Sequence, residues 1–229
     1  MTERVPVYLE TGAKRTFAVA VEWPGWARSG RTEEDALAAL VEYSPRYARS
    51  LKRAAADLTP PGDIADLDVV DRVKGDSGTE FGVPSISTRA DERAITAAEL
   101  DRLIGVLEAS WRAVERAAAA AEGVELSKGP RGGGRDLDKI VEHVAGADEA
   151  YLGAFGSRIP KDAPPDPTER WVAVRSALLD EIRARVGGAP EPPMGPRRKK
   201  PLWQPRYLIR RSAWHALDHA WELEDRAVR

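Results

Sequence analysis

The sequence predicts an α+β fold in which a small unit of strands and one helix precedes four long helices. Two runs near the N-terminus are rich in β-branched and aromatic residues, as strands are. After residue 95, apolar residues recur at helical spacing in four runs, which breaks rich in Gly and Pro separate. The chain has 229 residues, 42% of them hydrophobic, which is enough for two compact units. We expect an α+β domain over residues 1–75, a linker over 76–95 and a four-helix bundle over 96–229.

The N-terminal unit is expected to have the order β-β-β-α-β. Residues 5–10 and 16–23 read as strands joined by a turn, and residues 26–30 form a short third strand after Pro24 and Gly25. Thr32 is a candidate N-cap because acidic residues follow it, where they suit the helix dipole. Pro45 should kink or split the helix that follows. Residues 66–73 alternate well enough to be a strand that returns to the same sheet.

The second half begins at a capping box, Thr96 to Glu99, which opens a long helix. A second helix is expected from Asp136, a third from Pro167, and a fourth from about Arg206 to Ala227. Four long helices with connectors between them favour a bundle. In the segment before them, which is otherwise irregular, a strand could form at residues 79–87.

The composition excludes several classes of function. The chain contains no cysteine, so disulfide scaffolds, zinc fingers and thiol nucleophiles of its own are excluded. A formal net charge of -2 argues against nucleic acid as a partner. The N-terminus lacks the apolar core of a signal peptide, and no run is long enough to span a membrane, so we expect a cytoplasmic protein. A basic run at 197–200 could attract an anionic substrate, although a solvated loop is the more common role of such a run.

The three histidines of the chain are the strongest candidates for a functional site. His215 and His219 are four residues apart on the fourth helix, so both rings lie on one face about one turn apart. His143 lies in the middle of the second helix, which a bundle can bring opposite that pair. Three imidazoles with one position left open are a usual arrangement for a catalytic divalent metal. The sequence does not decide between zinc, nickel, iron and copper.

Residues 96–229 resemble the DinB/YfiT-like family of metalloenzymes. The segments IVEHVAGADEAYL and RRSAWHALDHAWELEDR supply one histidine on the second helix and an H-x-x-x-H pair on the last, which is the arrangement of that family. The resemblance implies a divalent metal (Zn, Ni or Fe) held by His143, His215 and His219. It also implies an enzyme that transfers a low-molecular-weight thiol or isomerises a small-molecule substrate, with mycothiol or bacillithiol as co-substrate. The absence of cysteine is consistent with a thiol supplied from outside.

Five further residues lie near the histidines in sequence and are candidates for the pocket. Metal-bound histidines usually donate their second N–H to a carboxylate or carbonyl, which makes nearby carboxylates candidate partners. Two tryptophans flank the histidine pair and could form walls of the site, although tryptophan more often fills a core. For each carboxylate, a solvated position on a helix face is the alternative. The five residues are Glu142, Asp218, Glu222, Trp214 and Trp221.

The N-terminal unit is similar to the HicB-like antitoxin fold. The similarity covers about residues 5–74 and is carried by FAVAVEWPGWARSGRTEEDALAAL, a strand that ends in a Pro-Gly turn before a short strand and a helix with an acidic start. It implies a shared fold and a role in forming a homodimer. An alternative to the enzyme is therefore a non-enzymatic interaction protein, antitoxin-like or active in a stress response, whose metal is structural or absent.

Overall fold

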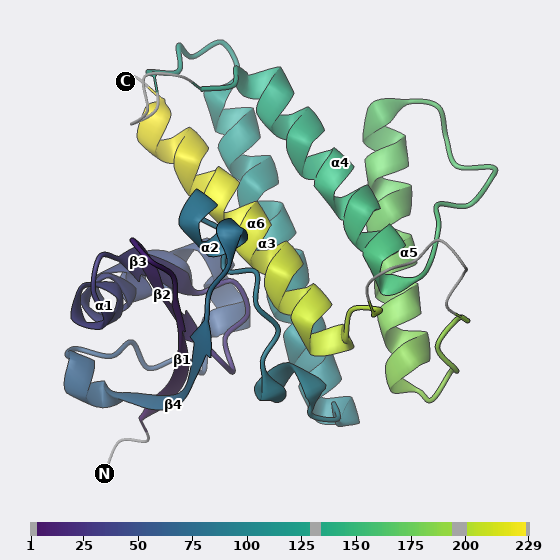
Figure 1. Cartoon of the computed structure of the whole chain (residues 1–229). Coiled ribbons are helices and arrows are strands. Elements are labelled where there is room, and N and C mark those ends of the chain that lie inside the picture. The colour runs from purple at the N-terminus through teal and green to yellow at the C-terminus, as the bar shows by residue number, and fades with distance from the viewer. Residues whose placement is uncertain (1–3, 129–133, 194–200, 228–229) are drawn as a thin grey trace.

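The computed structural model describes residues 4–128, 134–193 and 201–227, and it shows an α+β protein. A small mixed sheet with one long helix comes first, and a helical region follows it, as the sequence predicts. The two parts pack against each other along the last helix (Figure 1).

The sheet has four strands in the order β3-β2-β1-β4. They are β1 (Val5–Thr11), β2 (Thr16–Ala20), β3 (Ala27–Gly30) and β4 (Leu67–Lys74). The first three strands are antiparallel neighbours, whereas β4 runs parallel to β1 and makes the sheet mixed. Residues on alternate sides of β1 enter two different cores, since Val7 and Leu9 belong to one apolar cluster and Tyr8 to another.

Helix α1 (Glu33–Leu51) covers one face of the sheet. Its N-terminus carries the expected cap, with the Thr32 hydroxyl accepting a hydrogen bond from the Asp35 N–H at 3.0 Å. The helix runs through Pro45 without interruption, so the predicted split is absent. Tertiary packing outweighs the lost backbone hydrogen bond at that position: Tyr47 is fully buried, donates to the Pro24 carbonyl at 2.9 Å and stacks on Trp26.

The prediction of a strand at residues 79–87 is wrong, because a short helix, α2 (Ser77–Phe81), begins this segment. The Asp76 carboxylate caps it by accepting from the Gly78 and Thr79 N–H groups. The backbone N–H groups of Ser85 and Ile86, which a strand would give to a neighbour, donate instead to the buried Glu10 carboxylate, each at 3.1 Å. Three short 3-10 turns connect the other elements: η1 (Lys52–Ala55), η2 (Ile64–Asp66) and η3 (Arg89–Glu92).

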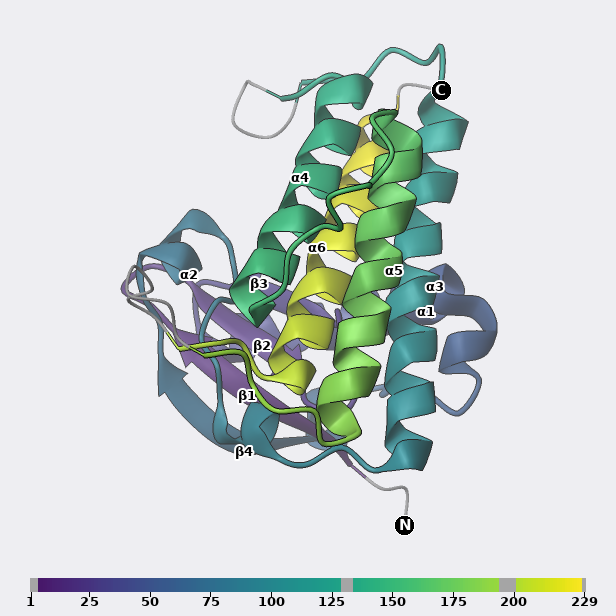
Figure 2. The same ribbon diagram turned by 90° about the vertical axis from the view of Figure 1, so that its right-hand side faces the viewer.

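Four long helices make up the second part, close to the predicted positions. They are α3 (Ala97–Ala121), α4 (Leu137–Phe155), α5 (Pro167–Val186) and α6 (Pro205–Arg226), and they lie side by side (Figure 2). Among the helices of the described residues, none is both long and apolar enough to cross a membrane.

Helix α6 is the centre of the molecule, with the sheet on one side and α3 and α4 on the other (Figures 1 and 2). Toward the sheet, Trp214 packs with Tyr8 and Val19. Toward α3, the Trp111 indole donates to the Ser212 hydroxyl at 3.1 Å. Most of the helix is therefore buried on every side.

Candidate metal centre

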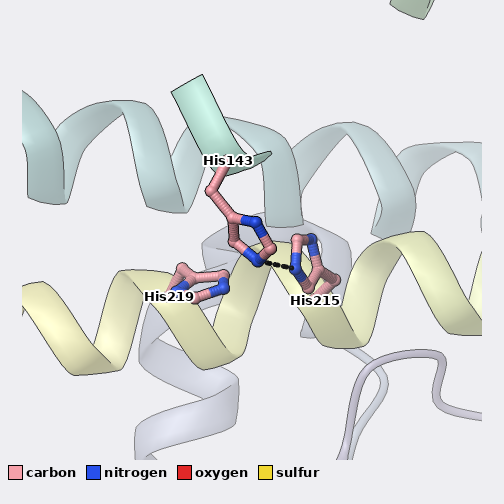
Figure 3. Close-up of side chains that lie close together, drawn as sticks. All are labelled: His143, His215 and His219. Atoms are coloured by element: carbon pink, nitrogen blue, oxygen red, sulfur yellow. Dashed lines mark hydrogen bonds between the residues drawn. The ribbon is translucent and has the colours of Figure 1, made fainter. Parts of the chain in front are cut away.

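The three histidines converge between α4 and α6, as Figure 3 shows. His143 projects from the middle of α4, and His215 and His219 project toward it from successive turns of α6. Ligand nitrogens of the three rings, one from each, all lie within 4.8 Å of one another. The ring centroids lie 4.6 to 5.0 Å apart and each pair meets edge to face. This group could hold a metal ion.

The spacing of the nitrogen atoms suits a single small cation. The Nε2 atoms of His143 and His215 lie 3.1 Å apart, a distance at which one ring can also donate a hydrogen bond to the other. Two nitrogens bound at about 2.1 Å to one ion, at tetrahedral or octahedral angles, are separated by about 3.0–3.4 Å. One pair already has that separation, and the widest pair would have to close by about 1.5 Å, which side-chain rotation can supply.

Burial keeps two of the rings neutral, which is the form that binds metal. His215 is only 6% exposed, and its pKa falls to about 2, chiefly because burial disfavours the imidazolium and then because His219 lies beside it. Burial also lowers the pKa of His143, which is half-buried. Near neutral pH these two rings therefore offer lone pairs rather than repelling a cation.

Glu222 orients the third histidine. Its carboxylate lies 2.8 Å from His219 Nδ1, and this hydrogen bond is the main reason why the pKa of Glu222 is lowered. A carboxylate accepts, so the Nδ1–H of His219 donates to it, and Nε2 is the ring nitrogen left to bind a metal. Arg226 donates to the other carboxylate oxygen at 2.6 Å and also to the carbonyls of Ser127 and Arg135. The orienting carboxylate is thus itself fixed in place.

The other two predicted carboxylates form no hydrogen bond or ion pair with the histidines in the part of the chain that the structure describes. Glu142 is exposed on α4. Asp218 faces the sheet and pairs with Arg28 of β3, at 3.7 Å. Of the three candidate carboxylates, the structure brings only Glu222 to a histidine.

The two predicted tryptophans differ in their surroundings. The Trp214 ring lies 6.2 Å from that of His215, so it lies beside the site. Trp221 points toward α1, where its indole donates to the Ser50 hydroxyl at 2.9 Å and its ring packs on Tyr43. Trp221 therefore joins α6 to the N-terminal unit, and Trp214 is the tryptophan next to the histidines.

Sequence reasoning missed two side chains beside the histidines. The Tyr151 ring lies 5.9 Å from the His215 ring. Arg211 lies one turn before His215 on α6, and its guanidinium packs on the rings of Tyr151 and Trp214. Helical spacing could have found both, since Tyr151 is two turns beyond His143 on α4 and Arg211 precedes His215 by four residues.

No protein-family model, curated protein or solved structure matches the chain. The DinB/YfiT-like and HicB-like resemblances therefore stay predictions, and the case for a metal depends on the arrangement of the three histidines. The basic run at 197–200, which could attract an anion, lies outside the described residues.

Proposed function

We propose that this protein is a divalent-metal-dependent enzyme of the DinB/YfiT-like type, with His143, His215 and His219 as the metal ligands. The observation that carries the proposal is that one nitrogen from each of three histidines, on two separate helices, lies within 4.8 Å of the others. The three are all the histidines of the chain, and chance rarely brings every member of a scarce residue type to one point.

The donor set and its surroundings support a catalytic ion over a purely structural one. Structural zinc sites use four protein ligands, most often with cysteine, whereas three protein ligands leave a position for water or a substrate. This chain has no cysteine, and no fourth side chain joins the three histidines in the metal-ligating group found among the described residues. A bound zinc, nickel or iron ion would supply Lewis acidity, which lowers the pKa of a water or thiol bound to it.

The residues around the histidines have supporting roles. Glu222 holds His219 with its Nε2 atom free, and the neutral state of buried His215 keeps that ring ready to bind. We propose a thiol-dependent transfer or isomerisation on a small molecule as the reaction, with an external thiol such as mycothiol or bacillithiol. That assignment depends on the family resemblance of residues 96–229.

Metal analysis of the untagged protein tests the proposal. We expect close to one divalent ion per chain in the wild type, and near-complete loss in the His215→Ala, His219→Ala double variant, since one imidazole cannot retain the ion. Because the double variant also removes two buried rings, circular dichroism should accompany it, and the single exchange His143→Gln, at a half-buried position, provides a milder test. A wild type without metal, whose melting temperature does not change with zinc or nickel, would favour the non-enzymatic antitoxin-like alternative.

A further inference from the structure

Arg211 lies near His215 but takes no part in the hydrogen bonds that the three histidines form among the described residues. It is on α6, one helical turn before His215, so the two side chains share a face of the helix. Its guanidinium carbon lies 4.6 Å from the centroid of the Trp214 ring and 5.6 Å from that of Tyr151. The Tyr151 ring is in turn 5.9 Å from His215, so Arg211, Tyr151 and His215 form one continuous group.

The charge of Arg211 is not neutralised by a carboxylate among the described residues. Its Nη1 atom is buried and has no hydrogen-bond partner in the part of the chain that the structure describes. Asp218 interacts electrostatically with Arg211, but it forms its ion pair with Arg28. An unpaired buried donor costs on the order of 1–3 kcal/mol, and more if it is charged. Arg28, Arg175 and Arg185 each have one such nitrogen too, but each of them also pairs with a carboxylate.

Three other arginines of the same helix show how this protein treats a buried guanidinium. Arg206, Arg210 and Arg226 are all less than a tenth exposed, and each donates to a carboxylate and to at least one backbone carbonyl. Their carboxylate partners lie 2.6 to 2.7 Å away: Glu99, Asp91 and Glu222, respectively. Arg211, which is half-buried and one turn from His215, departs from this pattern, because it forms no ion pair with a carboxylate among the described residues and its buried Nη1 atom has no partner there.

We propose that Arg211 binds a carboxylate group of the substrate, while the reacting part of the substrate lies at the histidines. This inference rests on the proposed function, and it adds a substrate class, namely small organic acids. A guanidinium presents parallel N–H donors whose geometry matches the two oxygens of a carboxylate, and the aromatic rings of Tyr151 and Trp214 hold its plane in place. The rings supply no acceptor for the Nη1 donors of Arg211, and a bound carboxylate would supply one.

Acetate is a suitable probe, with acetamide as its uncharged counterpart of nearly the same shape. Titrated into metal-free protein, acetate should shift the NMR signals of the Arg211 Nε–H and the Trp214 indole N–H along a saturable curve, and acetamide should not. Removing the metal first prevents acetate from binding to the ion instead. Arg211→Gln should weaken acetate binding at least tenfold, and Arg211→Lys should bind with intermediate strength, because lysine keeps the charge but not the paired donors. The exposed Arg53 of η1 provides a control, since Arg53→Gln removes the same charge away from the site and should bind like the wild type.

Equal shifts with acetate and acetamide, or no saturable shift, would overturn the inference and show that Arg211 serves only to stack on the rings. The inference is also overturned if Arg211→Gln binds acetate as tightly as the wild type does. If Arg211→Gln does not fold, Arg211→Lys serves in its place. Metal analysis separates this inference from the proposed function. Metal binding without acetate binding leaves the metal site intact and rejects the role of Arg211, whereas acetate binding by a chain that never takes up metal rejects the assignment of the anion to a substrate.

Discussion

Replacing Glu222 tests whether the carboxylate beside His219 prepares that ring for a metal. In the wild type, Glu222 fixes the His219 Nδ1–H at 2.8 Å and is itself held by Arg226 at 2.6 Å. Glu222→Ala removes this hydrogen bond, so the ring is free to rotate and to carry its proton on either nitrogen. Loss of such a partner typically lowers metal affinity 10- to 100-fold, which corresponds to about 1.4–2.7 kcal/mol.

The assay is a competition for Zn²⁺ between the protein and a chromophoric chelator, at pH 7 and fixed ionic strength. Glu224→Ala is the matched control, because it removes the same charge from the same helix. Glu224 is about half exposed and pairs with Arg46, which keeps its second partner, Asp225. We expect the control to bind zinc within about twofold of the wild type, since exposed ion pairs contribute about 0–1 kcal/mol.

Two results would refute this reasoning. If Glu222→Ala binds zinc as tightly as the wild type, the carboxylate does not orient His219. If Glu224→Ala weakens binding as much as Glu222→Ala does, the effect is one of overall charge, and the hydrogen bond at 2.8 Å is not its cause.

Two further predictions concern the stability of the scaffold. The Glu99 carboxylate accepts hydrogen bonds from Thr96 and from Arg206, which lowers its pKa to about 2. The stabilisation that these bonds give the fold is therefore complete above the unfolded-state pKa of 4.5 and is lost as the pH falls toward 2. Glu99→Gln should lower the free energy of unfolding in urea by about 1 kcal/mol at pH 7, and the difference from the wild type should shrink between pH 5 and 3. A constant difference over that range would contradict this. Gly25 has a φ of 90°, and a Cβ added there would lie 2.8 Å from a methyl carbon of Leu217. Gly123 also has a left-handed backbone, but a Cβ added there would meet open space. Gly25→Ala should therefore lower the free energy of unfolding more than Gly123→Ala does. Equal losses of unfolding free energy would show that α6 moves away at no cost.

Local sequence patterns were enough to predict the helices and strands that a single strong pattern marks. The N-cap at Thr32, the capping box at Thr96 and the helical spacing of apolar residues correctly predicted the starts of α1 and α3, and the order of the strands along the chain is as predicted. The failures lie where distant groups decide. The buried Glu10 carboxylate accepts hydrogen bonds from the backbone N–H groups of residues 85 and 86, and no local pattern around residues 79–87 predicts these bonds.

In the candidate site, too, local spacing predicted some features, and tertiary packing decided the others. Helical spacing placed His215 and His219 on one face, and only the packing of α4 against α6 brings His143 to them. Spacing also allowed Glu222 to reach His219, as it does, but could not tell that Trp221 turns toward Ser50. Helical spacing also places Arg211 one turn before His215, but its lack of a hydrogen-bond partner for Nη1 among the described residues depends on its three-dimensional surroundings and has no signature in the sequence.

X-ray absorption spectroscopy of the metal-loaded protein tests the convergence of the three rings most directly. It counts the nitrogen neighbours of the ion and distinguishes imidazole rings from other donors. We predict three imidazoles at about 2.0–2.1 Å, with water or another light atom completing the shell, and two imidazoles in the His143→Gln variant. A spectrum of the wild type with fewer than three imidazoles, or one that His143→Gln leaves unchanged, would contradict the metal centre between α4 and α6.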